Sequence, residues 1–490
     1  MNNKKAINQL SIMIFITIIT QIFMLLKGSV IASKFGVSIE LDAFNFANSI
    51  TTVIYSFIGT GISTILIPNL VEDYRKKSIN IFITVLYSIS FFLLIIMFIF
   101  RKNIIQILSA STDSYFLLTC SNIFISTLIS GFLNSLLGLV NAVLQYKGEF
   151  NRLKIISLVT IIIIFLSLLL GNNVDIYYYT IVILITTIIS TIVHLYLLKR
   201  SGFRYSIDFN IKEPFFRKMI ILFIPTVLST GIYQISLIID SVISSRLGVG
   251  QISILNYSNT IIGMINILFL GNISSFMYPR LINTCRGNKC QKKLSEYIIL
   301  INTLMCFVVS LFFVLGKEAI KMLYERGNFT NDNTKIVYIC AIIYILALPT
   351  NAIRDLIYKY FYINNDTYTP FKNSIIVSIL NISISLILSK FIGIYGIVLG
   401  TVMTSYISLL CIIIRFKKKF TFKFDKMIFI KENLKIFIIA LISSFSFIFI
   451  KSMISINNII LISILFTIGI FILWIALIKL MKSIVINIKL

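Results

Sequence analysis

Charged residues are scarce in this sequence. They make up 13% of its 490 residues, whereas soluble domains contain about 25%. Hydrophobic residues reach 58%, and the mean hydropathy is +0.97. A soluble fold of this length has no interior large enough to bury so much apolar surface. The composition therefore excludes an ordinary soluble protein and predicts a protein embedded in lipid.

Residues that usually carry chemistry are also few. There is one histidine, His194, and the six cysteines are scattered. Cys285 and Cys290 share a basic loop without a nearby histidine, which is a poor zinc site. No Walker A sequence is present. We expect no metal, no cofactor and no enzyme activity.

Long apolar runs are abundant. A membrane span needs about 20 mostly apolar residues, which predicts an all-α polytopic protein with about fourteen transmembrane helices. We place them at 9–33, 43–71, 79–100, 117–145, 153–170, 177–198, 219–246, 252–282, 295–316, 335–361, 371–390, 393–414, 435–452 and 458–480.

The distribution of basic residues predicts the orientation of these spans. Lys+Arg number 44 against 18 Asp+Glu, for a net charge of +26. If the N-terminus is cytoplasmic, about three-quarters of the cations fall in cytoplasmic segments, as the positive-inside rule requires. We expect a bacterial inner-membrane protein with both termini in the cytoplasm. Dispersed cations facing anionic lipid explain the charge without nucleic-acid binding.

Two stretches of the chain repeat each other at an offset of 211 or 212 residues. Residues 31–36 match 243–248, residues 45–50 match 256–261, and residues 68–70 match 279–281. Six spans separate the copies, so both have one orientation, and transporters of this design bind substrate between two lobes. We expect residues 1–200 to form one lobe, 201–218 a cytoplasmic linker, 219–415 a second lobe, and 416–490 a basic linker with two more helices.

Several spans contain polar residues that lipid cannot hydrogen-bond. Lys27 lies deep in the first span, where snorkelling to an interface is the alternative to a cavity-facing role. For Asp240 a structural role is as well supported as a transport role. Asp355 and Lys359 are spaced to pair across one helical turn. We expect the substrate to bind Lys27, Asp42, Asn45, Asn48, Tyr55, Asp240, Arg246, Asn256, Asn259 and Thr260.

Four motifs resemble those of the MurJ/MviN-type lipid II flippases. They are Ile31–Gly36 followed by Asp42-Ala-Phe44, then residues 138–145, then Leu323–Thr330 with its Arg-Gly-x-Phe, and Phe361–Pro370 with its Asp-Thr-x-Thr-Pro. The resemblance implies the multidrug/oligosaccharidyl-lipid/polysaccharide exporter fold. It also implies transfer of undecaprenyl-pyrophosphate-linked peptidoglycan precursor to the outer leaflet, in the service of cell-wall biogenesis and beside its synthesis machinery.

The resemblance also marks departures. The family holds pyrophosphate with cavity arginines, and its first arginine corresponds to Lys27, which keeps the charge but not the bidentate fork. The other two cations fall near Ile54 or Tyr55 and at Asn259–Thr260, where this chain is uncharged. A flippase for another polyprenyl-linked oligosaccharide, a cation-coupled drug exporter and a membrane glycan polymerase remain the alternatives.

Overall fold

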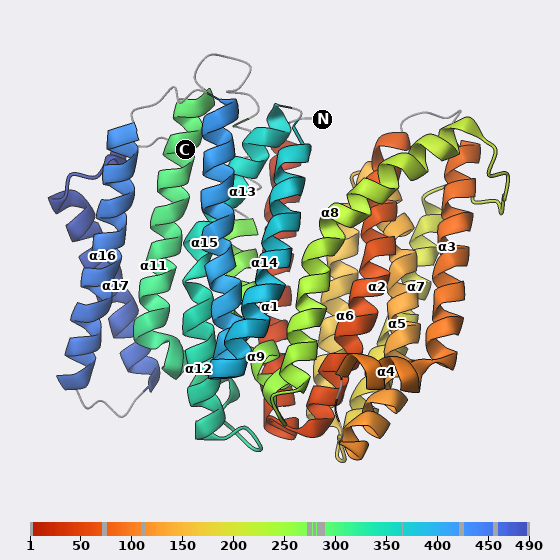
Figure 1. Cartoon of the computed structure of the whole chain (residues 1–490), viewed down its shortest axis with the longest axis horizontal. Coiled ribbons are helices and arrows are strands. Elements are labelled where there is room, and N and C mark those ends of the chain that lie inside the picture. Colours follow the sequence, from red (N-terminus) through yellow and green to blue (C-terminus); the bar gives the residue numbers. More distant parts are fainter. Residues whose placement is uncertain are drawn as a thin grey trace. The chain divides into compact units, whose positions relative to one another are not determined.

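The computed structural model describes residues 3–70, 76–109, 111, 113–271, 277, 281, 290–364, 366–420, 426–453 and 459–487. These residues form helices and their connections, and no strand occurs among them. Figure 1 shows the helices running mostly alongside one another within each part of the chain.

The helices in chain order are α1 (Asn3–Phe35), α2 (Ile39–Asn69), α3 (Lys76–Ile99), α4 (Arg101–Ser109), α5 (Ser114–Tyr146), α6 (Phe150–Leu170), α7 (Ile176–Arg200), α8 (Pro214–Ser245), α9 (Gln251–Ile265), the π-helix η2 (Asn266–Gly271), α11 (Cys290–Tyr324), α12 (Asn331–Ile345), α13 (Ala347–Ile363), α14 (Tyr368–Ile392), α15 (Ile394–Lys419), α16 (Lys426–Met453), α17 (Ile459–Leu480) and the 3₁₀ helix η3 (Ile484–Asn487).

The predicted all-α membrane architecture is confirmed. The described residues of each of the fourteen predicted spans are almost entirely helical. Among the described residues, thirteen segments are long and apolar enough to cross a membrane. The last part of the span predicted at 252–282 lies mostly outside the described residues, and α4 is an additional short helix.

The span predicted at 335–361 is interrupted between α12 and α13. Leu346 lies between the two helices, and Pro349 follows three residues later. Proline has no amide hydrogen to donate to the carbonyl of Ile345, and its ring crowds that carbonyl. The chain therefore ends one helix and starts the next at this point.

Polar residues begin several helices where the sequence places them. Ser38, Asp113, Asp175, Glu213 and Thr330 each accept a hydrogen bond from a backbone amide of the first turn of the following helix. Such caps satisfy amides that have no partner inside the helix. The starts of α2, α5, α7, α8 and α12 are thus fixed by local sequence.

The chain forms two compact units. The first comprises Met1–Ser253 together with Arg326–Phe329. Its most extensive helix pair is α2 with α5. A Cβ atom on Gly138 would lie 2.4 Å from the carbonyl oxygen of Gly59, so the two backbones touch there. Small residues allow this approach in membrane helices.

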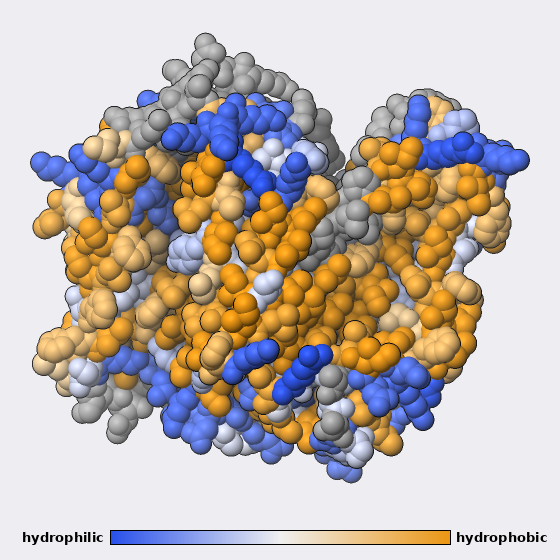
Figure 2. Space-filling model, viewed as in Figure 1, coloured by the Kyte–Doolittle hydropathy of each residue, from blue (hydrophilic) through white to orange (hydrophobic). Residues whose placement is uncertain are grey.

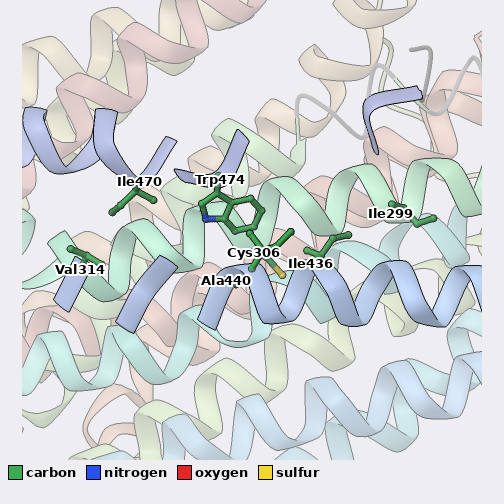
Figure 3. Packing of buried hydrophobic residues seen from close by; sticks show 8 residues of the cluster. Ile299, Cys306, Val314, Ile436, Ala440, Ile470 and Trp474 are labelled. Atoms are coloured by element: carbon green, nitrogen blue, oxygen red, sulfur yellow. The ribbon is translucent and has the colours of Figure 1, made fainter. Parts of the chain in front are cut away.

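The second unit comprises Ile254–Glu325 and Thr330–Leu490. In it α11 packs against α12, α13, α16 and α17. Figure 3 shows Trp474 of α17 beside Cys306 of α11 and Ala440 of α16, within a buried hydrophobic cluster. The indole Nε1 of Trp474 donates to Ser443 Oγ at 2.9 Å, so its one polar atom is satisfied.

The outer surface of each unit matches a lipid environment. Large apolar side chains are exposed along the helices, for example Phe92 of α3, Ile192 of α7 and Phe445 of α16. On the face seen in Figure 2, hydrophobic residues cover the middle of the helices and hydrophilic residues gather near their ends. Lipid covers such surfaces in membrane proteins.

Candidate functional site

Asp42 lies in the first turn of α2 and is 3% exposed. Its Oδ2 accepts from the amide of Gly250 at 2.5 Å. Its Oδ1 accepts from the amide of Ser253 at 2.7 Å and from Ser253 Oγ at 2.6 Å. Because α9 begins at Gln251, the carboxylate caps its N-terminus, where the helix dipole favours negative charge.

Asn45 joins the same network one turn along α2. It is buried, and its Nδ2 donates to Ser253 Oγ at 3.4 Å. Three polar side chains thus converge within the first unit. The contacts give Asp42 and Asn45 a structural function, and their binding of substrate stays a prediction.

Arg246 follows α8 and is exposed. It borders a pocket of about 430 Å³ in the first unit, together with Asp42, Ser111, Asp113 and Ser245. The pocket lies at helix ends, so it is placed differently from a cavity in the middle of a membrane span. A contact between Arg246 and a substrate stays a prediction.

Lys27 is half-buried in α1. It lies eight positions before Phe35, which places it about 12 Å along the helix axis from that end. Its ammonium forms no hydrogen bond or ion pair with any residue that the structure describes. It is a cation inside a membrane span with its hydrogen-bonding capacity unused.

Asp240 lies near the end of α8 and is 7% exposed. Its Oδ1 has no hydrogen-bond partner in the described part of the chain. Asp240 also forms no ion pair with Arg246, which lies six positions further on and is likewise a described residue. Buried ionisable groups of this kind in membrane spans are commonly functional, but its role stays a prediction.

Tyr55 and Asn48 occupy opposite environments on α2. Tyr55 is 2% exposed, its ring makes an edge contact with Phe132, and Gly131 leaves room for it. Asn48 is exposed, and its Oδ1 accepts only a long contact of 3.4 Å from Thr52 among the described residues. Tyr55 is placed for packing, whereas Asn48 is accessible to a ligand.

The three remaining candidate residues lie on the part of α9 that belongs to the second unit. Asn256 and Asn259 are exposed, and Thr260 is half-buried. Thr260 Oγ1 donates to the backbone oxygen of Asn256 at 2.8 Å. These side chains form a polar strip on a helix whose other residues are largely apolar.

A second pocket, of about 500 Å³, lies in the second unit. Its lining from α11, α13, α15 and α16 is almost entirely apolar. The polar exceptions are Asn302 and Asn433, and they bond to each other: Asn302 Nδ2 donates to Asn433 Oδ1 at 2.7 Å. Such a surface suits hydrocarbon and not a sugar.

Two of the four motifs contact one another, which their sequence positions do not indicate. The amide of Asn328 donates to the carbonyl of Ser33 at 2.9 Å, and its Nδ2 donates to that of Lys34 at 2.5 Å. Gly36 and Gly327 both have positive φ, +57° and +56°. A Cβ on either would lie within 2.3 Å of a backbone oxygen, so only glycine fits this contact.

The Asp-Thr-x-Thr-Pro motif has a structural function at the start of α14. Asp366 Oδ1 accepts from the amide of Thr369 at 2.9 Å, and its Oδ2 accepts from Thr369 Oγ1 at 2.7 Å. Lys419 forms an ion pair with Asp366 at 2.6 Å. The motif therefore joins the start of α14 to the end of α15.

Sequence reasoning did not identify Gly250 and Ser253 as partners of Asp42. A signal was present, because Ser253 stands at the 211-residue offset from Asp42 that relates the repeat copies.

No group of three or more metal-ligating side chains occurs among the described residues.

Comparison with known proteins gives concordant results. The family model described as "Lipid II flippase MurJ" matches residues 31–468. A probable lipid II flippase MurJ from Rickettsia prowazekii is 26% identical over 415 residues, which is 81% of each chain. One from Buchnera aphidicola is 26% identical over 431 residues, covering 84% of this chain and 83% of the relative.

Solved structures agree on the fold. One described as "Lipid II flippase MurJ, inward closed conformation" superposes with a TM-score of 0.82 at 24% identity, covering 94% of this chain and 97% of that one. An inward-facing multidrug-resistance MATE transporter of the MOP superfamily gives a TM-score of 0.66 at 13% identity, covering 82% and 94%.

Proposed function

Since this chain belongs to the lipid II flippase MurJ family, we propose that it moves the lipid-linked peptidoglycan precursor lipid II from the inner to the outer leaflet of the bacterial inner membrane. The match over residues 31–468, which includes nearly all of the spans, carries this conclusion. The exporter fold and the long apolar helices agree with it.

The physical problem for such a transporter is the headgroup. Each unsatisfied polar group costs several kcal/mol in hydrocarbon, so sugars and pyrophosphate need a polar route. The prenyl tail can stay in lipid throughout. A membrane potential that is negative inside favours outward movement of an anion by about 2.3 kcal/mol per charge per 100 mV.

We assign Lys27 the role of attracting the pyrophosphate. It is a cation with unused hydrogen-bonding capacity more than two turns inside α1, and an opposite charge would offset the cost of keeping it there. Asn48, Asn256 and Asn259 expose amide groups that can donate to and accept from sugar hydroxyls. Alternating access then carries the headgroup across, with the N-terminus in the cytoplasm as the positive-inside rule favours.

Replacing Lys27 tests this assignment. We expect Lys27→Ala to abolish growth of a strain depleted of its own lipid II flippase, with normal protein levels in the membrane, because the pyrophosphate loses its counter-charge. Lys27→Arg should preserve growth, since it keeps the charge and adds a bidentate fork.

Lys34→Ala is the matched control on the same helix, because its backbone carbonyl accepts from Asn328, and its ammonium forms no hydrogen bond or ion pair with any described residue. It should support normal growth. Full growth with Lys27→Ala would remove Lys27 from the mechanism. If the unsubstituted chain instead rescued a capsule-flippase deletion and not the lipid II strain, another polyprenyl-linked glycan would be the substrate.

A further inference from the structure

The connection between α7 and α8, residues 201–213, carries a surface that flipping does not explain. α7 spans the membrane and ends at Arg200, and α8 begins at Pro214. Residues 203–210 form neither helix nor turn, and a turn follows at residues 211 and 212. Because the connection directly follows a membrane span, it lies at the membrane surface, which the positive-inside rule assigns to the cytoplasm.

One side of this segment is fixed to α3 by hydrogen bonds. Ser206 Oγ accepts from Asn80 Nδ2 at 2.7 Å. The Tyr205 hydroxyl lies 2.7 Å from Thr84 Oγ1, which also accepts from the amide of Asp208 at 3.4 Å. These three contacts hold residues 205–208 against the first turns of α3.

The same connection presents an apolar row. We use this name for Ile207, Phe209 and Ile211, which are 72%, 61% and 57% exposed. These side chains stay exposed although Tyr205 and Ser206 are bound to α3. No described residue covers them.

The charge available around the apolar row is positive. Lys199, Arg200, Arg204 and Lys212 are exposed. Each of the two nearby carboxylates accepts a hydrogen bond from a backbone amide. Asp208 Oδ1 accepts from Asn210 at 2.9 Å, and Glu213 Oε2 accepts from Phe216 at 2.6 Å.

Glu213 remains ionised beside these cations. Partial burial alone would raise its pKa, but hydrogen bonds from Ser78 and from the amides of Phe216 and Phe215 lower the pKa below its ordinary value. Glu213 therefore keeps its negative charge at the start of α8, and the four exposed cations outnumber the two carboxylates of the connection.

We propose that the apolar row inserts into the inner-leaflet interface while the flanking cations bind the phosphates of anionic phospholipids. Exposed aliphatic and aromatic side chains flanked by Lys and Arg are the pattern of interfacial membrane segments. Position favours lipid over a protein partner, because the segment is tied at one end to a membrane span and can reach the headgroups without any movement of the chain. It holds the cytoplasmic ends of α3 and α8 against the inner leaflet.

Tryptophan quenching in liposomes tests the insertion. The chain has a single tryptophan, Trp474, which is buried and gives a constant baseline. We expect a Trp introduced as Phe209→Trp to be quenched by phospholipid with brominated acyl chains, to emit at shorter wavelength, and to resist aqueous iodide present on both sides. Asn210→Trp is the matched control, at the neighbouring exposed polar residue outside the apolar row, and should show the reverse.

The preference for anionic lipid is tested in the same liposomes. Brominated phosphatidylglycerol should quench the introduced Trp more than brominated phosphatidylcholine at an equal mole fraction. Arg204→Gln and Lys212→Gln should each reduce this preference, by up to about fivefold per cation. Iodide quenching of the Phe209→Trp variant equal to that of Asn210→Trp would overturn the proposal and leave the row as a protein-docking surface. Equal quenching by the two lipids would overturn the phosphate contact.

Discussion

Helices α2 and α9 are counterparts in the internal repeat, but their N-termini are satisfied in different ways. Ser38 precedes α2 and accepts from the amide of Leu41 at 3.3 Å, so α2 is capped by its own sequence. The first turn of α9 has no acidic residue. Its amides are capped by Asp42 of α2, through Gly250 and Ser253.

The difference shows how a duplicated segment can become complementary to its copy. Asp42 and Ser253 occupy equivalent positions at an offset of 211 residues, and one accepts hydrogen bonds from the other. The first copy keeps a local cap and supplies a carboxylate, and the second copy supplies amides and a hydroxyl. The start of α9 therefore depends on a residue about two hundred positions away, whereas the start of α2 does not.

Removing Asp42 should produce the largest loss of stability in this comparison. Asp42→Ala leaves the buried amides of Gly250 and Ser253 without an acceptor, and we expect the free energy of unfolding to fall by about 2–4 kcal/mol. Ser38→Ala removes one half-buried cap and should cost about 1 kcal/mol. Thermal unfolding of the purified protein in detergent measures both.

Asp42→Asn separates charge from shape. It keeps one acceptor oxygen but loses the negative charge at the positive end of α9, so its effect should fall between those of Asp42→Ala and Ser38→Ala. A cost for Ser38→Ala equal to that of Asp42→Ala would refute the asymmetry between the two copies.

Local features of this fold could be predicted from sequence, and long-range ones could not. The membrane spans could be located because each is a run of about 20 mostly apolar residues that are neighbours in the sequence. The pairing of Asp355 with Lys359 is confirmed at 2.9 Å, since both lie on one helix face. The nine-residue α4 is too short to register as a span, and it was missed.

The candidate site illustrates the limit more sharply. Asp42, Asn48 and Tyr55 all belong to one polar helix in the sequence, and polarity alone predicted a shared function for them. The structure gives them three different environments: a helix cap, an exposed position and a buried aromatic contact. Which face of a helix is covered depends on the helices that pack against it. The spacing of residues within α2 does not identify those neighbouring helices.

The glycines that precede the two helices offer a smaller test of the same asymmetry. Gly36 and Gly248 are repeat counterparts, both with positive φ, at +57° and +126°. A Cβ on Gly36 would lie 2.2 Å from the backbone oxygen of Asn328, whereas a Cβ on Gly248 would meet no atom within 4 Å. Both alanine variants carry a backbone cost of about 1–2 kcal/mol.

Only Gly36→Ala must also displace the Asn328 backbone. We therefore expect its unfolding midpoint in detergent to fall further than that of Gly248→Ala. Equal midpoints would mean that the contact between residues 33–36 and 326–329 contributes no stability, and the comparison would then rest on Asp42 alone.

The smallest loss of stability is expected at Asp366. Like Asp42, it is a carboxylate that accepts a hydrogen bond from an amide at the start of a helix. Burial alone would raise the pKa of Asp366, but hydrogen bonds from Lys419 and Thr369 outweigh it and lower the pKa from 3.8 to about 2. Because the folded pKa lies below the unfolded one, the ionised carboxylate stabilises the fold above about pH 4, and this contribution is lost as the pH falls towards about 2.

Asp366→Asn should therefore lower the free energy of unfolding by about 1–2 kcal/mol at neutral pH, with allowance for the half-exposed Lys419. It should also flatten the decline of the unfolding midpoint below about pH 4, because the variant has no proton to bind there. Lys419→Gln should reproduce part of both effects. The contradicting result is an equal loss in the free energy of unfolding for Asp366→Asn and Asp42→Ala. A carboxylate that caps its own helix would then stabilise the fold as much as one that caps a distant helix. The contrast between the repeat copies would fail.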